Sequence, residues 1–179
     1  QTLQNLGIKI FVLNAKNVNG VASMLNSLGK LTGMEKEAAA LSSKLLHERD
    51  SLKLLSETKE KSQCIVIIGT NPIMTASKTS FINEIMELGG LKNIYAESSM
   101  DYPTISYEDI TVKNPASILL PYDTTKTDKL KVEIDELSKH LSVSDAVKKN
   151  NFIVVDNNVV FRPGPRVIDA VRIIRNKVK

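Results

Sequence analysis

Side chains that commonly carry enzyme chemistry are sparse in this sequence. It contains two histidines, His47 and His140, and a single cysteine, Cys64. Neither histidine belongs to a recognisable motif with a serine, a cysteine or a carboxylate, so the sequence does not indicate a catalytic histidine. Cys64 heads an apolar run, which favours a buried structural thiol over a nucleophile. A single cysteine also excludes an internal disulfide and a cysteine metal cluster.

Phosphate and metal chemistry are equally poorly supported. The stretch 69–72, Gly-Thr-Asn-Pro, follows an apolar run as a phosphate loop would, but it has neither the GxxxxGK[ST] nor the GxGxxG pattern. The carboxylates are not clustered, and His and Cys are too few for a metal centre. Two alternatives stay open: a doubly wound α/β enzyme acting on a phosphorylated or nucleotide substrate, and an interaction module whose sheet only presents helices.

Ligand binding without chemistry is the better prediction. The segments that follow the expected strands are rich in Ser, Thr, Asn, Tyr, Met and Pro, which make adaptable ligand contacts. Tyr102 and Tyr122 could wall an aromatic ligand or pack against their own loops. Arg162 precedes an expected helix N-terminus, where it could meet an anionic group or pair with a carboxylate. Together with Met74, these residues are expected to line one surface.

The elements that must position those residues alternate along the chain. Apolar runs predict strands at 8–13, 64–68, 93–96, 117–120 and 152–155, the last extended by 159–161 after a turn. Helical periodicity and caps predict helices at 18–28, 80–88, 106–113, 129–141, 145–149 and 165–178. This alternation predicts an α/β fold with a doubly wound parallel sheet. Its site loops, at the carboxyl ends of the strands, are 69–78, 97–103, 121–127 and 162–165.

The longest expected helix runs from Thr32 to about Lys61. Thr32 and Glu35 have the spacing of a capping box, and no Pro or Gly follows Gly33 in this stretch. At 1.5 Å per residue it would span roughly 40 Å. It is either a surface helix over a sheet or a strut between two α/β bodies. The apolar positions at helical spacing, through which we expect it to pack, include Leu41, Leu45, Leu52 and Leu55.

Bulk composition narrows the class of protein. A hydrophobic content of 42% and a charged content of 25% are ordinary for a soluble globular protein. The net charge is +4, with scattered lysines and no basic tract interleaved with aromatics, so nucleic acid is not an expected partner. No run of about twenty apolar residues could span a membrane. The chain begins at Gln1 and quickly reaches the apolar run 8–13, so we expect upstream residues of a longer protein to be missing and the fragment to self-associate through its incomplete N-terminal part.

Several motifs, taken together, resemble one family. The stretch 29–33, Gly-Lys-Leu-Thr-Gly, resembles the approach to the linker helix of the periplasmic binding proteins for cobalamin, haem and iron-siderophores. These are the substrate-binding components of ABC importers, with ligand held between two α/β lobes. Matching segments follow in the same order across nearly the whole chain, at 80–84, 89–90, 93–94, 101–108, 114–121, 151–156 and 162–166.

The resemblance implies a division of the chain and a function. Residues 1–33 would be a remnant of the N-terminal lobe, 34–61 the linker helix and 62–179 the C-terminal lobe, with small hinge motion. The protein would not be an enzyme and would need no cofactor, because its ligand would itself be a metal chelate: an iron-siderophore, haem or cobalamin. An ABC permease would dock against a surface glutamate, with Glu84 and Glu87 as candidates. The location would be extracytoplasmic, in the periplasm or as a cell-surface lipoprotein, with the signal segment outside this sequence.

Overall fold

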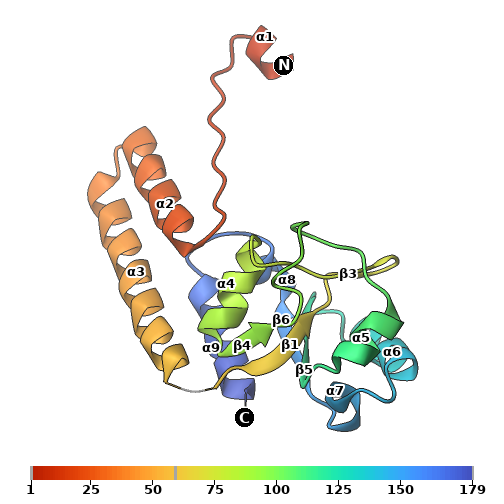
Figure 1. Cartoon of the computed structure of the whole chain (residues 1–179). Helices are drawn as coiled ribbons and strands as arrows, with labels where there is room; N and C mark the ends of the chain where they lie inside the picture. Colours follow the sequence, from red (N-terminus) through yellow and green to blue (C-terminus); the bar gives the residue numbers. More distant parts are fainter. Residues whose placement is uncertain (1, 59, 179) are drawn as a thin grey trace.

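A four-stranded parallel sheet forms the body of the protein. The structure, a computed structural model, describes residues 2–58 and 60–178 (Figure 1). The strands lie in the order β4-β1-β5-β6 and comprise β1 (Ser62–Val66), β4 (Leu91–Asn93), β5 (Ser117–Tyr122) and β6 (Phe152–Asp156). Because β4 adds to one side of β1 while β5 and β6 add to the other, the order in which strands are added changes side at β1, although all four strands stay parallel. The predicted doubly wound α/β fold is confirmed.

Helices cover both faces of the sheet. On one face, Cys64 and Val66 pack in a cluster with residues of α4 (Phe81–Leu88) and α9 (Val167–Lys177). On the other, Ile65 and Ile67 pack with residues of α5 (Tyr107–Lys113), α6 (Thr127–His140) and α7 (Asp145–Lys148). Alternate side chains along this strand therefore enter different cores, which explains why the run 64–68 is continuously apolar. Figure 1 shows the sheet between these two layers.

A helical hairpin stands beside this body. It consists of α2 (Val18–Thr32) and α3 (Glu35–Glu57), and its upper half projects beyond the sheet (Figure 1). The long helix is continuous as predicted, although it is shorter at both ends. Leu45 and Leu52 are buried, but the prediction was wrong for Leu41 and Leu55, which are 42% and 52% exposed. The reason is that α3 packs mainly along α2 and reaches α4 and α9 over only part of its length.

The predicted capping box at Thr32 does not form. Thr32 is the last residue of α2, and its hydroxyl donates to the Leu28 carbonyl at 2.9 Å. Gly33 follows in the left-handed conformation, at φ 72°, which suits a residue without a Cβ and ends α2. Met34 then precedes α3, and no side chain caps that helix. Gly29, expected at the end of α2, instead lies inside it. An ideal Cβ there would sit 2.5 Å from Ala38 Cβ, so glycine lets the two helices approach closely.

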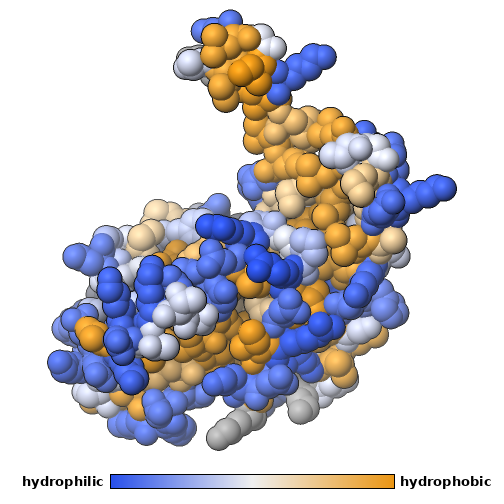
Figure 2. All heavy atoms as spheres, turned by 180° about the vertical axis from the view of Figure 1, so that it is seen from behind, coloured by the Kyte–Doolittle hydropathy of each residue, from blue (hydrophilic) through white to orange (hydrophobic). Residues whose placement is uncertain are grey.

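The N-terminal segment contradicts another prediction. After α1 (Thr2–Asn5), residues 8–13 run away from the body as an extended, unpaired segment and form no strand (Figure 1). Ile10, Phe11 and Val12 are 45%, 59% and 82% exposed. The apolar pattern that predicted a buried strand is present, but the described residues offer it no neighbouring strand. Seen from behind, hydrophobic residues continue from this segment along the projecting hairpin (Figure 2).

Three element boundaries also differ from the predictions. The strand expected at 93–96 is β4, and it ends at Asn93 because the Asn93 side chain accepts from Tyr95 N–H and turns the chain. The loop expected at 69–78 contains a short antiparallel hairpin of β2 (Gly69–Thr70) and β3 (Ile73–Met74). Residues 159–161 do not extend β6, because Asp156 caps the short helix α8 (Asn157–Val160) by accepting from Asn158 N–H at 2.8 Å. The sequence allowed either Thr79 or Ser80 to cap the helix that ends at Leu88, and the structure has Ser80 as the cap of α4. The cap expected at Ser106 is confirmed at α5.

Candidate functional site

The carboxyl ends of the four strands meet at one edge of the sheet, and the predicted ligand-binding residues lie there. Met74 follows β1 and Tyr102 follows β4, whereas Tyr122 ends β5 and Arg162 follows β6 and α8. The strand order places their segments in the sequence Tyr102, Met74, Tyr122, Arg162 along the edge. Adjacent strands are about 4.8 Å apart, so this carboxyl edge spans about 14 Å.

The segment after β1 is a hairpin rather than a phosphate loop. Gly69 pairs with Met74, the Asn71–Pro72 peptide bond is cis, and the Ile68 N–H donates to the Met74 carbonyl at 3.0 Å. No helix begins until Phe81. The backbone amides therefore lack the strand-loop-helix arrangement that cradles a phosphate. Met74 itself is half-buried in β3.

The loop that carries Tyr102 is fixed against this hairpin. Backbone amides of Thr75 and Ser77 donate to the carbonyls of Pro103 and Asp101 at 3.1 and 2.9 Å. The hydroxyl of Thr79 also donates to the Asp101 carboxylate. Tyr102 lies between these two anchored residues and is 47% exposed. Its backbone is therefore held on both sides while its side chain remains accessible to a ligand.

Tyr122 and Arg162 lie at the other half of the edge. Tyr122 is half-buried and pairs in register with Asp156, whose side chain caps α8. Phe161 is the C-cap residue of α8. Arg162 follows it directly and is exposed. Within residues 2–58 and 60–178, Arg162 takes part in no ion pair, so its guanidinium stays accessible to solvent.

Two further residues of this edge escaped the sequence prediction. Met100 is 58% exposed two positions before Tyr102, and Phe161 is 45% exposed beside Arg162. The sequence pattern assigned Phe161 to an extension of the last strand, and it was therefore not considered as an exposed residue. The Asp156-Asn157-Asn158 sequence is the signal that could have indicated a capped turn and hence an exposed Phe161. Exposed Met and Phe side chains add apolar contact surface to the edge.

The two docking candidates have different environments on α4. Glu84 is half-buried, and its carboxylate accepts the Val18 N–H at 2.6 Å, at the first turn of α2. Burial raises the pKa of Glu84 above its ordinary value, an effect that the Val18 hydrogen bond partly offsets. Glu87 is exposed and accepts from the Asn83 amide at 3.0 Å. Glu84 is therefore engaged by the backbone of α2, whereas Glu87 bonds to a side chain of its own helix and remains exposed.

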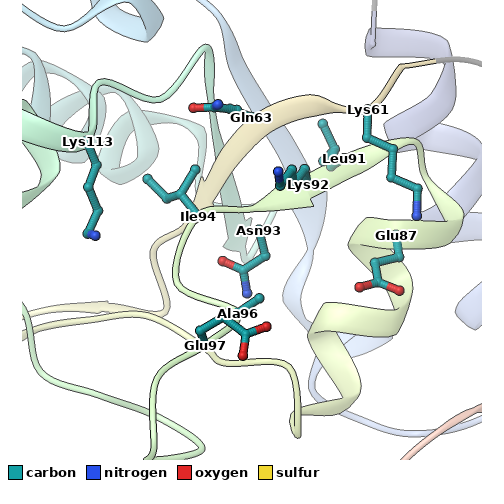
Figure 3. Close-up of a pocket in the computed structure, with 10 residues that line it drawn as sticks. All are labelled: Lys61, Gln63, Glu87, Leu91, Lys92, Asn93, Ile94, Ala96, Glu97 and Lys113. Atoms are coloured by element: carbon teal, nitrogen blue, oxygen red, sulfur yellow. The ribbon is translucent and has the colours of Figure 1, made fainter.

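A separate cavity lies away from these residues, along the outer side of β4. This β4 hollow has a volume of about 590 Å³ and is shown in Figure 3. Its lining includes none of Met74, Tyr102, Tyr122 or Arg162. It was not predicted, because its residues come from several separated segments. They are Lys61, Gln63, Glu87, Leu91, Lys92, Asn93, Ile94, Ala96, Glu97 and Lys113.

The single cysteine behaves as a core residue. Cys64 has no exposed surface, and burial raises the pKa of its thiol to about 12. A thiol of that pKa is almost entirely protonated near neutral pH and is a poor nucleophile. Across the described stretches 2–58 and 60–178, no helix is long and apolar enough to cross a membrane, and no group of three or more His, Cys, Asp or Glu could hold a metal ion.

Comparison with known proteins identifies the family of the chain. Residues 2–159 match the sequence profile described as Periplasmic binding protein. The chain belongs to the periplasmic binding protein family. A vitamin B12-binding protein of Salmonella paratyphi A is 28% identical over 66% of this chain and 44% of its own length. An uncharacterized ABC transporter substrate-binding lipoprotein of Bacillus subtilis, YvrC, is 29% identical over 94% of this chain and 53% of its own length.

A solved structure gives the same result for the fold of this periplasmic binding protein. A possible iron-binding (periplasmic solute-binding) protein from Staphylococcus epidermidis superposes with a TM-score of 0.82 at 25% identity. The match covers 98% of this chain and 68% of that protein. The chain spans about half the length of the curated relatives it matches.

Proposed function

We propose that this chain is part of the substrate-binding component of an ABC importer for an iron-siderophore, haem or cobalamin. The observation that carries the proposal is the carboxyl edge, where Tyr102 and Arg162 are both accessible on a sheet of the family fold. Relatives named for vitamin B12 and iron point to the same class of ligand. The chain would bind rather than transform its ligand, and the alternative of a phosphate- or nucleotide-dependent enzyme lacks its glycine-rich loop.

The proposal also divides the chain into two lobes and a linker helix. Residues 62–179 would form the C-terminal lobe and 34–61 the linker helix, with 1–33 belonging to the N-terminal lobe. The continuous helix α3 supports this division, because it packs on α2 at one side and reaches α4 and α9 of the body at the other. Its single uninterrupted span favours small hinge motion between lobes over a wide opening.

The ligand would lie across the carboxyl edge and be enclosed by the remainder of the protein. Tyr102 and Tyr122 would contact the flat part of a chelate, and Met74 would add apolar surface beneath it. Arg162 would face a carboxylate or another anionic group of the ligand. An edge of about 14 Å is wide enough for a macrocycle to contact several strands at once.

The proposed importer function also implies a partner protein and a cellular location. The partner would be an ABC permease, docked through α4, and Glu87 is the better candidate of the two glutamates because the carboxylate of Glu84 is engaged by Val18 N–H. The protein would be extracytoplasmic, in the periplasm or as a cell-surface lipoprotein. YvrC, the lipoprotein relative, supports this location.

Equilibrium dialysis against haemin, cyanocobalamin and a ferric hydroxamate tests the binding proposal. The measurement uses the longer polypeptide that contains this chain, because the proposed cleft needs two walls. Tyr102→Ala should weaken binding about tenfold, through loss of stacking worth about 0.5–1.5 kcal/mol beyond area burial. Arg162→Ala should weaken anionic ligands more than cyanocobalamin, with a loss that shrinks at high salt.

Arg172→Ala is the matched control, since Arg172 is an exposed arginine on α9 that pairs with Glu48 away from the carboxyl edge. It should leave all three affinities unchanged. Binding that is insensitive to both Tyr102→Ala and Arg162→Ala would place the ligand elsewhere. Absence of binding to all three ligand classes would contradict the proposed function as a whole.

A further inference from the structure

We propose that Thr79 is a positioning residue for the ligand site, and that it holds the loop carrying Tyr102 through the Asp101 carboxylate. The inference rests on the proposed function, because it takes Tyr102 as a ligand contact. It deepens that function by naming the interaction that gives the loop one conformation before a ligand arrives. The arrangement combines a backbone ladder, a chain of hydroxyl groups and buried support beneath both.

The backbone ladder joins the loop to the segment 73–77. Three N–H groups donate to carbonyls across it: Ile105 to Ile73 at 3.0 Å, Thr75 to Pro103 at 3.1 Å, and Ser77 to Asp101 at 2.9 Å. Tyr102 lies between the last two of these bonds. The next bond, from Lys78 N–H at 3.1 Å, goes to the Ala96 carbonyl, so residues 97–100 bulge out of the ladder. The Ser77–Asp101 bond is therefore the end of the ladder, where local opening is easiest.

A chain of hydroxyl groups closes this end. The Thr79 hydroxyl donates to the Asp101 carboxylate and lies 3.0 Å from the Ser77 hydroxyl. Thr79 has a single hydroxyl proton and a carboxylate only accepts, so Ser77 must donate to Thr79. Ser77 is fully buried, which fixes the first member of the chain. The chain ends on a charged acceptor, and hydrogen bonds to charged groups are stronger than those between neutral groups.

The inner side of the ladder is fixed by buried polar side chains. The Asn93 amide of β4 donates to the Ala76 carbonyl at 2.8 Å. The Ser80 hydroxyl, which caps α4, donates to the Ser77 carbonyl at 2.7 Å. Asn93 and Ser80 are both 5% exposed, so water does not compete freely for these bonds. The inner side is thus anchored to β4 and α4, and Thr79 connects this anchored frame to the exposed loop.

The position of Tyr102 depends on this connection. Pro103 restricts the backbone of Tyr102 on one side. On the other side, Asp101 and Thr79 are both exposed, so no packing replaces the bond between them. Loss of the Thr79 hydroxyl should let the end of the ladder open and the Tyr102 ring leave the carboxyl edge. A ligand would then have to order the loop as it binds, which lowers its affinity.

Amide hydrogen exchange on the whole chain tests the positioning without any ligand. Thr79→Val should speed the exchange of the Ser77 N–H, the donor to Asp101, by at least about threefold, because the end of the ladder opens more often. Thr79→Ser keeps the hydroxyl and should retain the slow exchange. The Ile67 N–H, which donates to the Leu119 carbonyl at 3.0 Å, is the internal control and should not change. Unchanged exchange of Ser77 in Thr79→Val would overturn the proposal.

Equilibrium dialysis on the longer polypeptide, with haemin, cyanocobalamin and the ferric hydroxamate, tests the consequence for binding. Thr79→Val should weaken the ligand that binds by about three- to fivefold, the size expected for one hydrogen bond, and Thr79→Ser should not. In a Tyr102→Ala background Thr79→Val should have no further effect, because Thr79 acts through the ring. Thr111→Val is the matched control: it removes a hydroxyl that donates to the Tyr107 carbonyl at 2.8 Å within α5.

Each contrary outcome has a distinct meaning. Unchanged affinity in Thr79→Val would overturn the proposal. So would an undiminished loss in the Tyr102→Ala background, an equal loss in Thr111→Val, or an equal loss in Thr79→Ser, because each would mean that the substitution acts through general stability. Failure of the unsubstituted polypeptide to bind all three ligands would instead contradict the proposed function, and amide exchange would still show whether Thr79 fixes the loop.

Discussion

Residues 8–13 and 64–68 are both predominantly apolar, but they have opposite environments. Ile65 and Val66 are fully buried between two helical layers, whereas Phe11 and Val12 are 59% and 82% exposed on a segment that pairs with none of the described strands. Both runs are apolar and rich in β-branched residues. What separates them is the surroundings: β1 has a strand on each side and helices on both faces, and 8–13 has neither.

The difference shows what an apolar run specifies. Apolar side chains create a tendency to be covered, worth about 25 cal/mol per Å² of buried apolar surface, but they do not identify the covering partner. In the α/β body the partner lies within the same chain. For 8–13 and the projecting half of the α2–α3 hairpin, the described residues provide none, and the exposed hydrophobic surface in Figure 2 remains available to another partner.

The largest expected effect tests this contrast with one matched pair of substitutions. Ile65→Ala should lower the free energy of unfolding by about 2–5 kcal/mol, because it leaves a cavity between well-packed layers. Ile10→Ala removes the same atoms from a side chain that is 45% exposed, and should change stability by less than about 0.5 kcal/mol. Urea denaturation followed by circular dichroism measures both. Equal losses would mean that 8–13 is as buried in solution as β1.

Self-association is the next effect in size. We expect the chain to associate through its exposed N-terminal segment, and Phe11→Ser/Val12→Ser should raise the dissociation constant about tenfold by removing apolar contact surface. Val112→Ser is a suitable control, because Val112 is 83% exposed on α5 and lies outside this apolar segment. Sedimentation equilibrium measures the change. A monomer at every concentration would refute the expectation.

Helix capping gives a smaller contrast between the body and the hairpin. Ser80→Ala should cost about 1 kcal/mol, because the Ser80 hydroxyl accepts from Asn83 N–H in the first turn of α4. Thr32→Ala should cost only a few tenths of a kcal/mol, since Thr32 ends α2 and caps nothing. Thermal unfolding of the two variants makes the comparison. A larger loss of stability for Thr32→Ala than for Ser80→Ala would support the capping box at Thr32 that the structure does not show.

The smallest effect is a pH dependence at the junction between the two regions. Burial raises the folded pKa of Glu84 above the ordinary value of about 4.5, so the folded state holds its proton more tightly than the unfolded state. Stability contributed by this group is therefore present below pH 4.5 and is lost as pH rises through the folded pKa. Glu84→Gln should flatten this part of the stability curve measured by urea denaturation from pH 4 to 7. An unchanged slope would mean that Glu84 is solvated.

Elements governed by local or in-chain interactions could be predicted from the sequence. The strands near 64–68, 117–120 and 152–155 are apolar runs between turn residues, and their covering helices follow in the same chain. Ser80 and Ser106 were recognised because a cap depends on three residues. The cap assigned to Thr32 failed for a related reason, since the same local pattern fits the end of α2 once Gly33 adopts a left-handed conformation.

The candidate site divides in a similar way. A parallel sheet brings the carboxyl ends of its strands to one edge, independently of how the helices pack. The sequence could therefore assign one edge to Met74, Tyr102, Tyr122 and Arg162. The β4 hollow and the Glu84–Val18 contact could not be predicted, because they join segments that are far apart in the sequence; Glu84 and Val18 are 66 positions apart. Side-chain packing decides such contacts, and no periodicity encodes it.

The hydrogen bond between Val18 and Glu84 also has a mechanical consequence. The N-terminal segment enters α2 at Asn17, whose side chain accepts from Gly20 N–H at 2.7 Å, and the next residue is held by α4 at 2.6 Å. A pulling force on the segment before Asn17 would therefore be transmitted directly to α4, through the Glu84 carboxylate, before it could bend the α2–α3 hairpin. Glu87 lies less than one turn further along α4, so tension arriving from the N-terminal side would be felt at the outer surface of the body without any rearrangement of the sheet.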